Sequence, residues 1–311
     1  MKIVIFGTGG VGGYFGGRLA QAGEDVTFIA RGEHLRALQI SGLKVDSLNG
    51  NFTVFPVKAT DDISQADPAD LIIVAVKAWQ VPGVARSLKS IITDSTTVLP
   101  LQNGVEAAPQ LVAELGPNAV IGGLCKIVSF VVGPGHIRHA GFTPSTVIGE
   151  LDNRQTDRIL KIADTLNHAG IETAIAANIE VALWMKFLFI ASFSGMGAIT
   201  GANAGRLRTD PELRSQMIQA MNEIYDLAHA RGVRLPADAI DTVMTGVNAL
   251  PEDATSSMQR DIAAGKPSEL ESQNGAVVRV ARAAGVEVPT HERIYVALKP
   301  LEEKARSASG G

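Results

Sequence analysis

Six residues near the N-terminus have the types and the spacing of a loop that binds a dinucleotide. They form a G-x-G-x-x-G motif and are Gly7, Thr8, Gly9, Gly10, Val11 and Gly12. Gly7 would let the chain turn sharply, Gly9 would let backbone N–H groups reach a pyrophosphate, and Gly12 would let a helix pack closely on a sheet. The phosphates would then lie at the positive end of the helix dipole. The alternative is that these glycines serve packing alone.

A basic residue, Arg31, stands where the second strand of such a motif would end. Enzymes that use NAD usually carry Asp or Glu there, and this carboxylate holds the ribose 2′-hydroxyl. A guanidinium can instead bind a 2′-phosphate through charge-assisted hydrogen bonds. We therefore expect NADP(H) as the cofactor, with an ordinary surface arginine as the alternative.

Two more polar residues lie at the ends of apolar runs of strand length. Lys77 ends the run 70–77, and Asn103 lies near the end of the run 96–104. Ligands of open α/β sheets bind outside the carboxyl ends of the strands, so both side chains are candidates for ligand contacts. Either residue could also be an ordinary loop residue.

Lys186 lies within a long apolar stretch, 181–199, and is the candidate acid catalyst. Burial among its apolar neighbours would disfavour the charged ammonium and lower its pKa toward the range useful for a general acid. The alternative is a lysine whose stem follows apolar surface while its ammonium reaches water. The stretch approaches transmembrane length, but Lys186, Gly195 and Gly197 interrupt it, so we interpret it as a buried core helix.

Polar residues also gather at the start of a helix that the pattern predicts over 268–284. Ser268 and Glu271 have the S-x-x-E spacing of a capping box. Glu269 takes no part in that box and would be a first-turn carboxylate favoured by the helix dipole. The pair at 274–275, Asn-Gly, is a poor one for a helix, which indicates close packing or a nearby ligand.

The elements that must position these residues alternate between strand and helix in the first half of the chain. Residues 1–6 predict a strand, 11–22 a helix that ends at Gly23, and 25–30 a second strand. This is the order of a dinucleotide-binding βαβ unit. Helices are also expected at 32–39 and 154–169, and strands at 43–45 and 52–57 (a hairpin turning at Asn49-Gly50), 70–77, 96–104, 119–122, 126–132, 136–139, 146–149 and 172–175.

The second half predicts helices, at 179–196, 211–230, 237–249, 255–264 and 268–284. The expected fold class is therefore α/β, with a Rossmann-type dinucleotide-binding domain over residues 1–177. An all-helical domain over residues 178–311 would follow it and carry the substrate and catalytic residues. Beyond Arg306 the chain consists of Ser, Ala and Gly, so its end is expected to fray.

Composition narrows the classes of function. Apolar residues make up 46% of the 311, charged residues 19%, and the net charge is −4, which indicates a globular protein with no electrostatic reason to bind nucleic acid or a membrane. The single cysteine, Cys125, excludes an intrachain disulfide, and the scattered histidines suggest no metal site. The chain begins with its first strand, so no signal peptide is expected and the cytoplasm is the expected location. A homodimer is left open.

Taken together, these residues resemble the ketopantoate reductase (2-dehydropantoate 2-reductase) family, in order and over nearly the whole chain. The resemblance implies a Rossmann-type N-terminal domain, a helical C-terminal domain and a cleft between them. It also implies NADPH-dependent reduction of the ketone of an α-keto acid, 2-dehydropantoate to pantoate, in pantothenate biosynthesis. The matching residues are the glycine motif at 7–12, Arg31, Val76-Lys77-Ala78, Gln102-Asn103-Gly104, Trp184-x-Lys186, Ser256-Ser257-Met258-x-x-Asp261 and Ser268-Glu269.

The resemblance also implies roles for individual residues. Lys186 would be the proton donor, and Lys77 and Asn103 would line the cofactor and substrate cleft. Ser257 would contact the substrate, and Glu269 would hold the nicotinamide-ribose end of the cofactor. An ammonium at Lys186 would neutralise the negative charge that grows on the carbonyl oxygen during hydride transfer.

The sequence departs from the family pattern where the family typically has asparagines. Ile190 and Ser194 stand one and two helical turns after Lys186, and Ala204 and Ala254 occupy two further positions. Ser194 remains a candidate substrate contact. A site that loses partners for a hydroxyl and a carboxylate loses about 1–3 kcal/mol for each unpaired buried group. We therefore expect a keto acid more apolar than ketopantoate.

Two other functions stay open at this point. One is a non-catalytic sensor or regulator that binds NADPH. The other is a dehydrogenase of the same superfamily that oxidises a β-hydroxy acid, which would carry glycine-rich substrate loops and a differently placed lysine.

Overall fold

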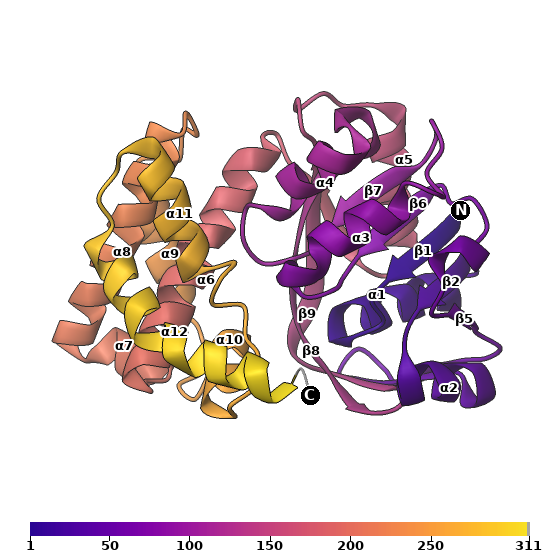
Figure 1. The fold of residues 1–311 in the computed structure, drawn as a ribbon, viewed down its shortest axis with the longest axis horizontal. Coiled ribbons are helices and arrows are strands. Elements are labelled where there is room, and N and C mark those ends of the chain that lie inside the picture. The colour runs from indigo at the N-terminus through magenta and orange to yellow at the C-terminus, as the bar shows by residue number, and fades with distance from the viewer. Residues whose placement is uncertain (310–311) are drawn as a thin grey trace. The chain divides into compact units, whose positions relative to one another are not determined.

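A computed structural model describes residues 1–309, which form two compact units (Figure 1). Unit 1 comprises residues 1–102 and 107–179, and unit 2 comprises residues 103–106 together with the chain from 180 onward. Unit 1 contains both strands and helices, whereas unit 2 is helical, so the predicted fold class is confirmed. The sequence predicted a single boundary between residues 177 and 178. In the structure the boundary lies at 179–180, and the separate segment Asn103–Glu106 also belongs to unit 2.

The first sheet of unit 1 is parallel and has the strand order β5-β2-β1-β6-β7. Its central strands are apolar; all four residues of β6 are buried, as expected of a strand covered on both faces, whereas the edge strand β5 is polar and partly exposed. The predicted strand, glycine turn, helix and strand are confirmed at the N-terminus. The elements are β1 (Lys2–Phe6), α1 (Gly10–Gln21), β2 (Asp25–Ile29), α2 (Gly32–Ser41), β5 (Lys58–Thr60), β6 (Leu71–Val74), α3 (Val81–Leu88), β7 (Thr97–Pro100) and α4 (Ala107–Leu115), with 3₁₀ turns at Ile63–Gln65, Ala78–Gln80 and Pro117–Ala119.

A second sheet in unit 1 has the order β10-β9-β3-β4, and β8 pairs with β9. The predicted hairpin at its edge is confirmed, with β3 and β4 antiparallel. The segments expected as four short strands between 119 and 149 are extended, but their division is wrong: β8 and β9 are two long strands, whose antiparallel ladder continues past Gly141 and Pro144 through local register shifts. The elements are β3 (Leu43–Ser47), β4 (Phe52–Val54), β8 (Ile121–Gly133), β9 (His136–Glu150), α5 (Asp157–His168) and β10 (Glu172–Ile175).

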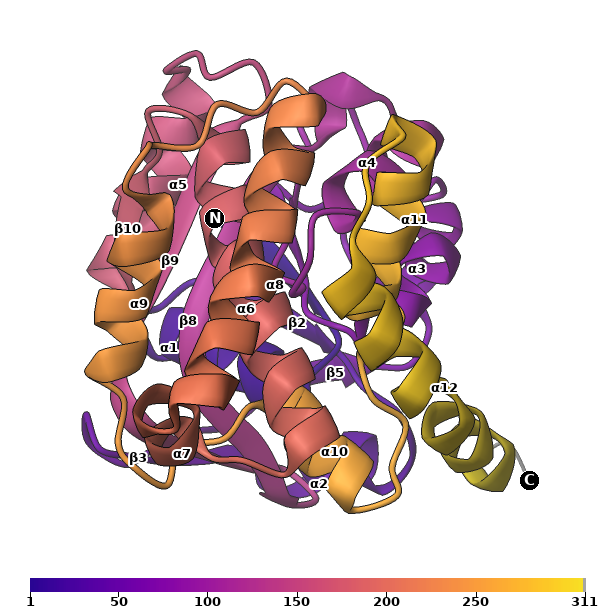
Figure 2. The ribbon, with the colours of Figure 1, turned by 90° about the vertical axis from the view of Figure 1, so that its left-hand side faces the viewer.

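Unit 2 is built around α8, which contacts α7, α9, α11 and α12 (Figure 2). α6 is the one helix of the described residues that is long and apolar enough to cross a membrane by length and composition, but 56% of its apolar window is buried. Phe187, Leu188 and Ala191 of α6 belong to the core of unit 2, as expected of a core helix. The helices are α6 (Ile179–Thr200), α7 (Ala204–Thr209), α8 (Pro211–Ala230), α9 (Ala239–Asn248), α10 (Ser257–Ala263), α11 (Asn274–Ala284) and α12 (Pro289–Ser309).

Two predictions at the C-terminal end are wrong. α11 begins at Asn274 and not at Ser268, and residues 270–273 form turns. The helix α12 was not predicted; it contains Pro300 and continues to Ser309, so the expected fraying beyond Arg306 does not hold there. Residues 310–311, the end of that expected segment, lie outside the described residues.

Candidate active site

The glycine loop after β1 is fixed by backbone hydrogen bonds to the end of β2. Gly7 has φ +100°, a conformation that favours glycine. The N–H groups of Gly7 and Thr8 donate to the carbonyl oxygen of Ile29 at 3.3 and 3.2 Å, and the Thr8 hydroxyl donates to the same oxygen at 3.0 Å. The neighbouring strands therefore determine the path of the loop.

The glycines of the loop differ in what surrounds them. A Cβ at Gly12 would clash with the carbonyl oxygen of Gly7, and one at Gly10 would clash with the carbonyl oxygen of Ser129. A Cβ at Gly9 would meet no atom within 4 Å. Gly10 and Gly12 thus allow close packing, while Gly9 leaves open space beside the N-terminus of α1, where N–H groups and the helix dipole favour an anion.

Arg31 lies just beyond β2, as N-cap residue of α2, and its side chain is exposed. His34, which no sequence motif indicated, lies within the first turn of the same helix. Burial lowers the pKa of His34, against a smaller opposing effect of a hydrogen bond with the Thr8 backbone. His34 therefore adds no positive charge beside Arg31 at neutral pH.

Lys77 and Gln102 lie at the carboxyl ends of β6 and β7. Lys77 is exposed, and its ammonium lies 5.9 Å from the ring centroid of Trp79. The buried Gln102 donates from Nε2 to the carbonyl oxygens of Val74 and Val76 at 2.9 and 3.0 Å. Gln102 thus holds the end of β6 in place, a role that the sequence did not indicate.

Asn103 and Glu269 lie in contact within unit 2. The Asn103 Nδ2 donates to Glu269 Oε2 at 3.3 Å, across 166 positions of sequence. Asn103 is half-buried and Glu269 is 7% exposed. The structure thus brings together two of the residues that the sequence nominated separately.

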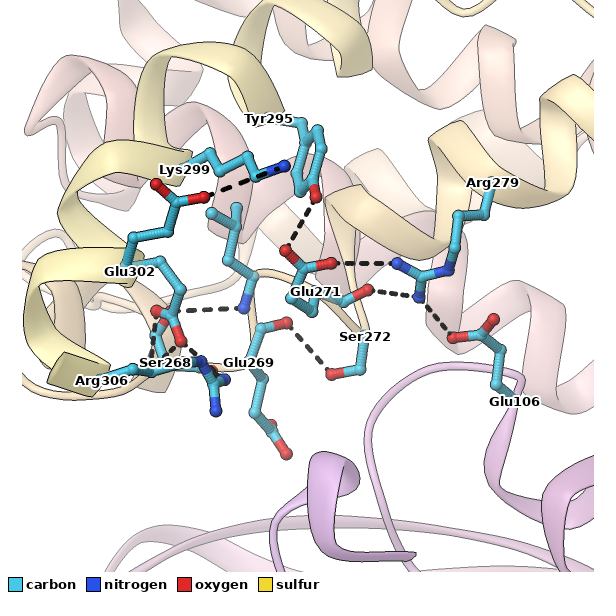
Figure 3. A network of polar contacts seen from close by, with 12 residues as sticks. Glu106, Ser268, Glu269, Glu271, Ser272, Arg279, Tyr295, Lys299, Glu302 and Arg306 are labelled. Atoms are coloured by element: carbon cyan, nitrogen blue, oxygen red, sulfur yellow. Dashed lines mark hydrogen bonds and ion pairs between the residues drawn. The ribbon is translucent and has the colours of Figure 1, made fainter. Parts of the chain in front are cut away.

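The loop that carries Glu269 is held by α12. Ser268 donates to the buried Glu302 carboxylate from its N–H at 2.9 Å and from its hydroxyl at 2.5 Å, and Arg306 pairs with Glu302 at 2.6 Å. Figure 3 shows these groups together, with the Glu269 carboxylate directed away from them. The predicted capping box of Ser268 and Glu271 is wrong, and so is the first-turn position of Glu269, because Glu302 accepts the Ser268 N–H and no helix begins there.

Lys186 lies in the middle of α6 and is half-buried, with the buried Phe187 beside it. α6 is anchored five residues further on, where Asn274 donates from Nδ2 to the carbonyl oxygen of Ala191 at 3.2 Å. The same Nδ2 lies 2.9 Å from Nδ1 of His291, whose Nε2 lies 3.0 Å from the carbonyl oxygen of Ala220. Asn274 is fully buried, so the close packing that the Asn-Gly pair indicated is confirmed.

The remaining candidates of unit 2 lie on α6 and α10. Ile190 is half-buried, and Ser194 is fully buried, with no hydrogen-bond partner for its hydroxyl among the described residues. Ser257 is half-buried at the first turn of α10. The two alanines that depart from the family pattern lie together, because the Ala204 N–H donates to the carbonyl oxygen of Ala254 at 2.9 Å.

Two family descriptions match the chain and together cover most of it. They are "Ketopantoate reductase PanE/ApbA" over residues 3–153 and "Ketopantoate reductase PanE/ApbA C terminal" over residues 178–302. The chain belongs to the ketopantoate reductase family. It is accordingly an oxidoreductase, as the resemblance implied.

Individual relatives match over nearly their whole length. The 2-dehydropantoate 2-reductase of Nostoc sp. is 30% identical over 98% of this chain and 97% of its own. A solved PanE/ApbA family ketopantoate reductase from Ralstonia eutropha is 33% identical, covers 98% of this chain and 100% of its own, and has a TM-score of 0.90. A D-mandelate dehydrogenase solved with NADH and anilino(oxo)acetate also has a TM-score of 0.90, but at 23% identity, over 98% of this chain and 100% of its own, it shows a shared fold alone. Within residues 1–309, no group of three or more His, Cys, Asp or Glu side chains could hold a metal ion.

Proposed function

We propose that this enzyme uses NADPH to reduce the keto group of a 2-keto acid, with Lys186 as the proton donor. The observation that carries the proposal is the hydrogen bond between Asn103 and Glu269, in the same unit as Lys186. Two segments far apart in the sequence converge there on a polar pair, and the family resemblance assigns both residues to the ligand site. Family membership supports the same reaction.

Unit 1 has the features that the nucleotide requires. The open space beside Gly9 and the N-terminus of α1 fit a pyrophosphate, and the exposed Arg31 fits a 2′-phosphate. Glu269 would accept hydrogen bonds from the ribose hydroxyls at the nicotinamide end, with Asn103 orienting its carboxylate. Bound NADPH supplies a hydride, and the remaining chemistry falls to the side chains.

Lys186 would stabilise the product alkoxide. As the carbonyl carbon gains a hydride, its oxygen gains negative charge, and an ammonium within hydrogen-bonding distance neutralises that charge by transferring a proton. The half-buried position of Lys186 on a helix anchored at Ala191 would limit how far its backbone can move.

The substrate is proposed to be more apolar than ketopantoate. Ile190 replaces an amide one turn after Lys186, and the paired backbones at Ala204 and Ala254 carry methyl groups where the family typically carries two more amides. A pocket with fewer hydrogen-bond partners gains little from a substrate hydroxyl and accommodates a branched or aromatic side chain. Ser194 keeps one hydroxyl that a substrate group could use.

Absorbance at 340 nm, with NADPH or NADH and a panel of 2-keto acids that includes ketopantoate, tests the proposal. We expect turnover with NADPH, fastest on a branched or aromatic keto acid. Lys186→Met should lower kcat by about 10²–10⁴-fold while NADPH binding, followed by fluorescence, stays unchanged. Lys304→Met, at an exposed position on α12, is the matched control and should retain wild-type activity.

Three results would contradict parts of the proposal. Tight NADPH binding without turnover of any keto acid would favour the sensor. Faster NADP⁺ reduction with hydroxy acids than NADPH oxidation with any keto acid would favour the oxidative dehydrogenase. A specificity constant on ketopantoate above that for every apolar keto acid would remove the apolar preference and leave the reaction standing.

A further inference from the structure

The segment Asn103–Glu106 is joined to the loop 268–273 by one guanidinium, that of Arg279 on α11. Its Nη2 donates to Glu106 Oε2 at 2.8 Å and to the backbone carbonyl oxygen of Glu271 at 2.7 Å. Its Nη1 donates to Glu271 Oε2 at 3.0 Å. Figure 3 shows Arg279 between the two carboxylates. A planar group with five donors can hold three acceptors in this way, which a lysine ammonium does less well.

The partners of Arg279 are themselves fixed. Tyr295 donates its hydroxyl to the second oxygen of Glu271 at 2.8 Å, and burial, together with this hydrogen bond, raises the pKa of Tyr295 to about 12. Tyr295 therefore remains a donor at every physiological pH. Burial alone would lower the pKa of Arg279, but its bonds to Glu106 and Glu271 outweigh burial and raise it. Arg279 therefore stays charged, and Tyr295 stays protonated, across the neutral range.

The two segments also touch along their backbones. Gly104 has φ +104°, and a Cβ at this position would lie 2.6 Å from the carbonyl oxygen of Ser272. The hydrogen bond of Asn103 to Glu269 lies at one end of this contact, and the Arg279 group lies at the other. Glu106 and Asn103 stand three residues apart on one short segment, so the Arg279 group and the Asn103–Glu269 hydrogen bond hold the two ends of the same contact.

We propose that Arg279 is a positioning residue that sets the alignment of Asn103 with Glu269 and thereby the affinity for the nicotinamide-ribose end of NADPH. The inference rests on the proposed roles of Asn103 and Glu269. Arg279 is 48% exposed, and half-exposed ion pairs contribute little to the free energy of unfolding. Its loss is thus expected to change cofactor binding far more than stability.

Arg279→Gln tests the inference, with NADPH titrated by fluorescence and kinetics followed at 340 nm. We expect the Kd and KM for NADPH to rise about tenfold, a change of about 1.4 kcal/mol, while kcat at saturating NADPH stays within about threefold. The matched control is Arg282→Gln, an exposed arginine on the same helix that should bind NADPH as the wild type does. Arg279→Lys should fall between the two.

A double-mutant cycle separates positioning from a general effect of charge. Glu106→Gln should raise the Kd by a smaller factor, and adding it to Arg279→Gln should raise the Kd no further, because both remove the same link. If Arg279→Gln fails to fold, Glu106→Gln carries the test alone, since it leaves Arg279 bonded to Glu271.

Unchanged NADPH affinity in the folded variants would overturn the inference. Equal weakening by Arg279→Gln and Arg282→Gln would also overturn it, because a loss of positive charge would then explain both. A wild-type protein that binds NADPH but reduces no keto acid would defeat the proposed reaction, and the Kd values would still decide the role of Arg279.

Discussion

Units 1 and 2 hold their candidate residues by different means. In unit 1, the glycine loop, Arg31 and Lys77 lie where strands of one sheet end, and backbone hydrogen bonds such as that from Thr8 to Ile29 fix their positions. In unit 2, Glu269 lies on a loop without helix or strand, and side chains from other helices hold it. The main chain therefore determines the site geometry of unit 1, whereas ion pairs and hydrogen bonds between distant segments determine that of unit 2.

The difference predicts which substitutions will damage folding and which will damage binding. A change at a packed main-chain position of unit 1 should act on stability first. A change at an exposed side chain that joins two segments of unit 2, such as Arg279, should mainly weaken ligand affinity. A change at a buried link of unit 2 should act on both.

Gly12→Ala is expected to have the largest effect on stability. Its Cβ would clash with the carbonyl oxygen of Gly7 and lie 3.0 Å from the Cβ of Ala75, and backbone cannot move aside as a side chain can. The free energy of unfolding in urea should fall by about 3 kcal/mol. Gly9→Ala is the control. A Cβ at Gly9 would meet no atom within 4 Å, and the residue has φ −78°, so this variant should keep its stability and lose NADPH affinity. Equal stability of the two variants would contradict the view that close main-chain packing at Gly12 stabilises unit 1.

Glu302→Gln tests a buried link of unit 2. This carboxylate is 2% exposed and accepts from Ser268 and Arg306, so removing its charge should lower the free energy of unfolding by about 2–3 kcal/mol. NADPH affinity should also weaken, because the loop of Glu269 loses its anchor. The neighbouring Glu303→Gln, at an exposed carboxylate, should change neither property. A stability loss with wild-type NADPH affinity would show that α12 does not position Glu269.

His291 adds a pH dependence to the anchoring of α6. Burial lowers its pKa to about 4, against a smaller opposing effect of the Ala220 carbonyl, while the unfolded chain has the ordinary value of about 6.5. The unfolded state therefore binds more protons between these values, so stability is full above pH 6.5 and is lost as the pH falls toward 4. Wild-type protein should lose about 2 kcal/mol between pH 7 and pH 5 from this group.

His291→Gln, unfolded in urea at the same two pH values, isolates that contribution. The variant should be less stable at pH 7, and its loss between pH 7 and pH 5 should be smaller than that of the wild type by about 2 kcal/mol. Equal losses in the two proteins would mean that His291 does not titrate as its burial requires.

The sequence predicted the elements that carry the N-terminal candidate residues because the relevant information is local. A strand, a glycine turn and a helix occupy consecutive residues, and Arg31 follows the next strand directly. The ladder of β8 and β9 was predicted poorly, because Gly141 and Pro144 interrupt the local pattern while the pairing with the partner strand continues.

The sequence nominated Glu269 but gave a wrong reason for its position. Ser268 and Glu271 have a capping spacing, yet the partner of Ser268 is Glu302, 34 residues away on a helix that was not predicted. Arg279 and His291 carried no signal at all, because an arginine and a histidine on helices have many possible environments. Only the packing of α11 and α12 shows that Arg279 links two segments and that His291 is buried. The individual roles in binding and catalysis stay predictions.

The division of the chain has a consequence for dissecting the protein. The chain passes between the units three times, at residues 102–103, 106–107 and 179–180. A gene that encodes only residues 180–311 would therefore produce an incomplete helical unit, in which Arg279 has lost Glu106 and Glu269 has lost Asn103. A single proteolytic cut at 179–180 would leave four residues of the helical unit on the other fragment. Reassembly from two fragments would thus depend on reinserting that short segment, and a helical unit that stands alone would need it supplied as a peptide.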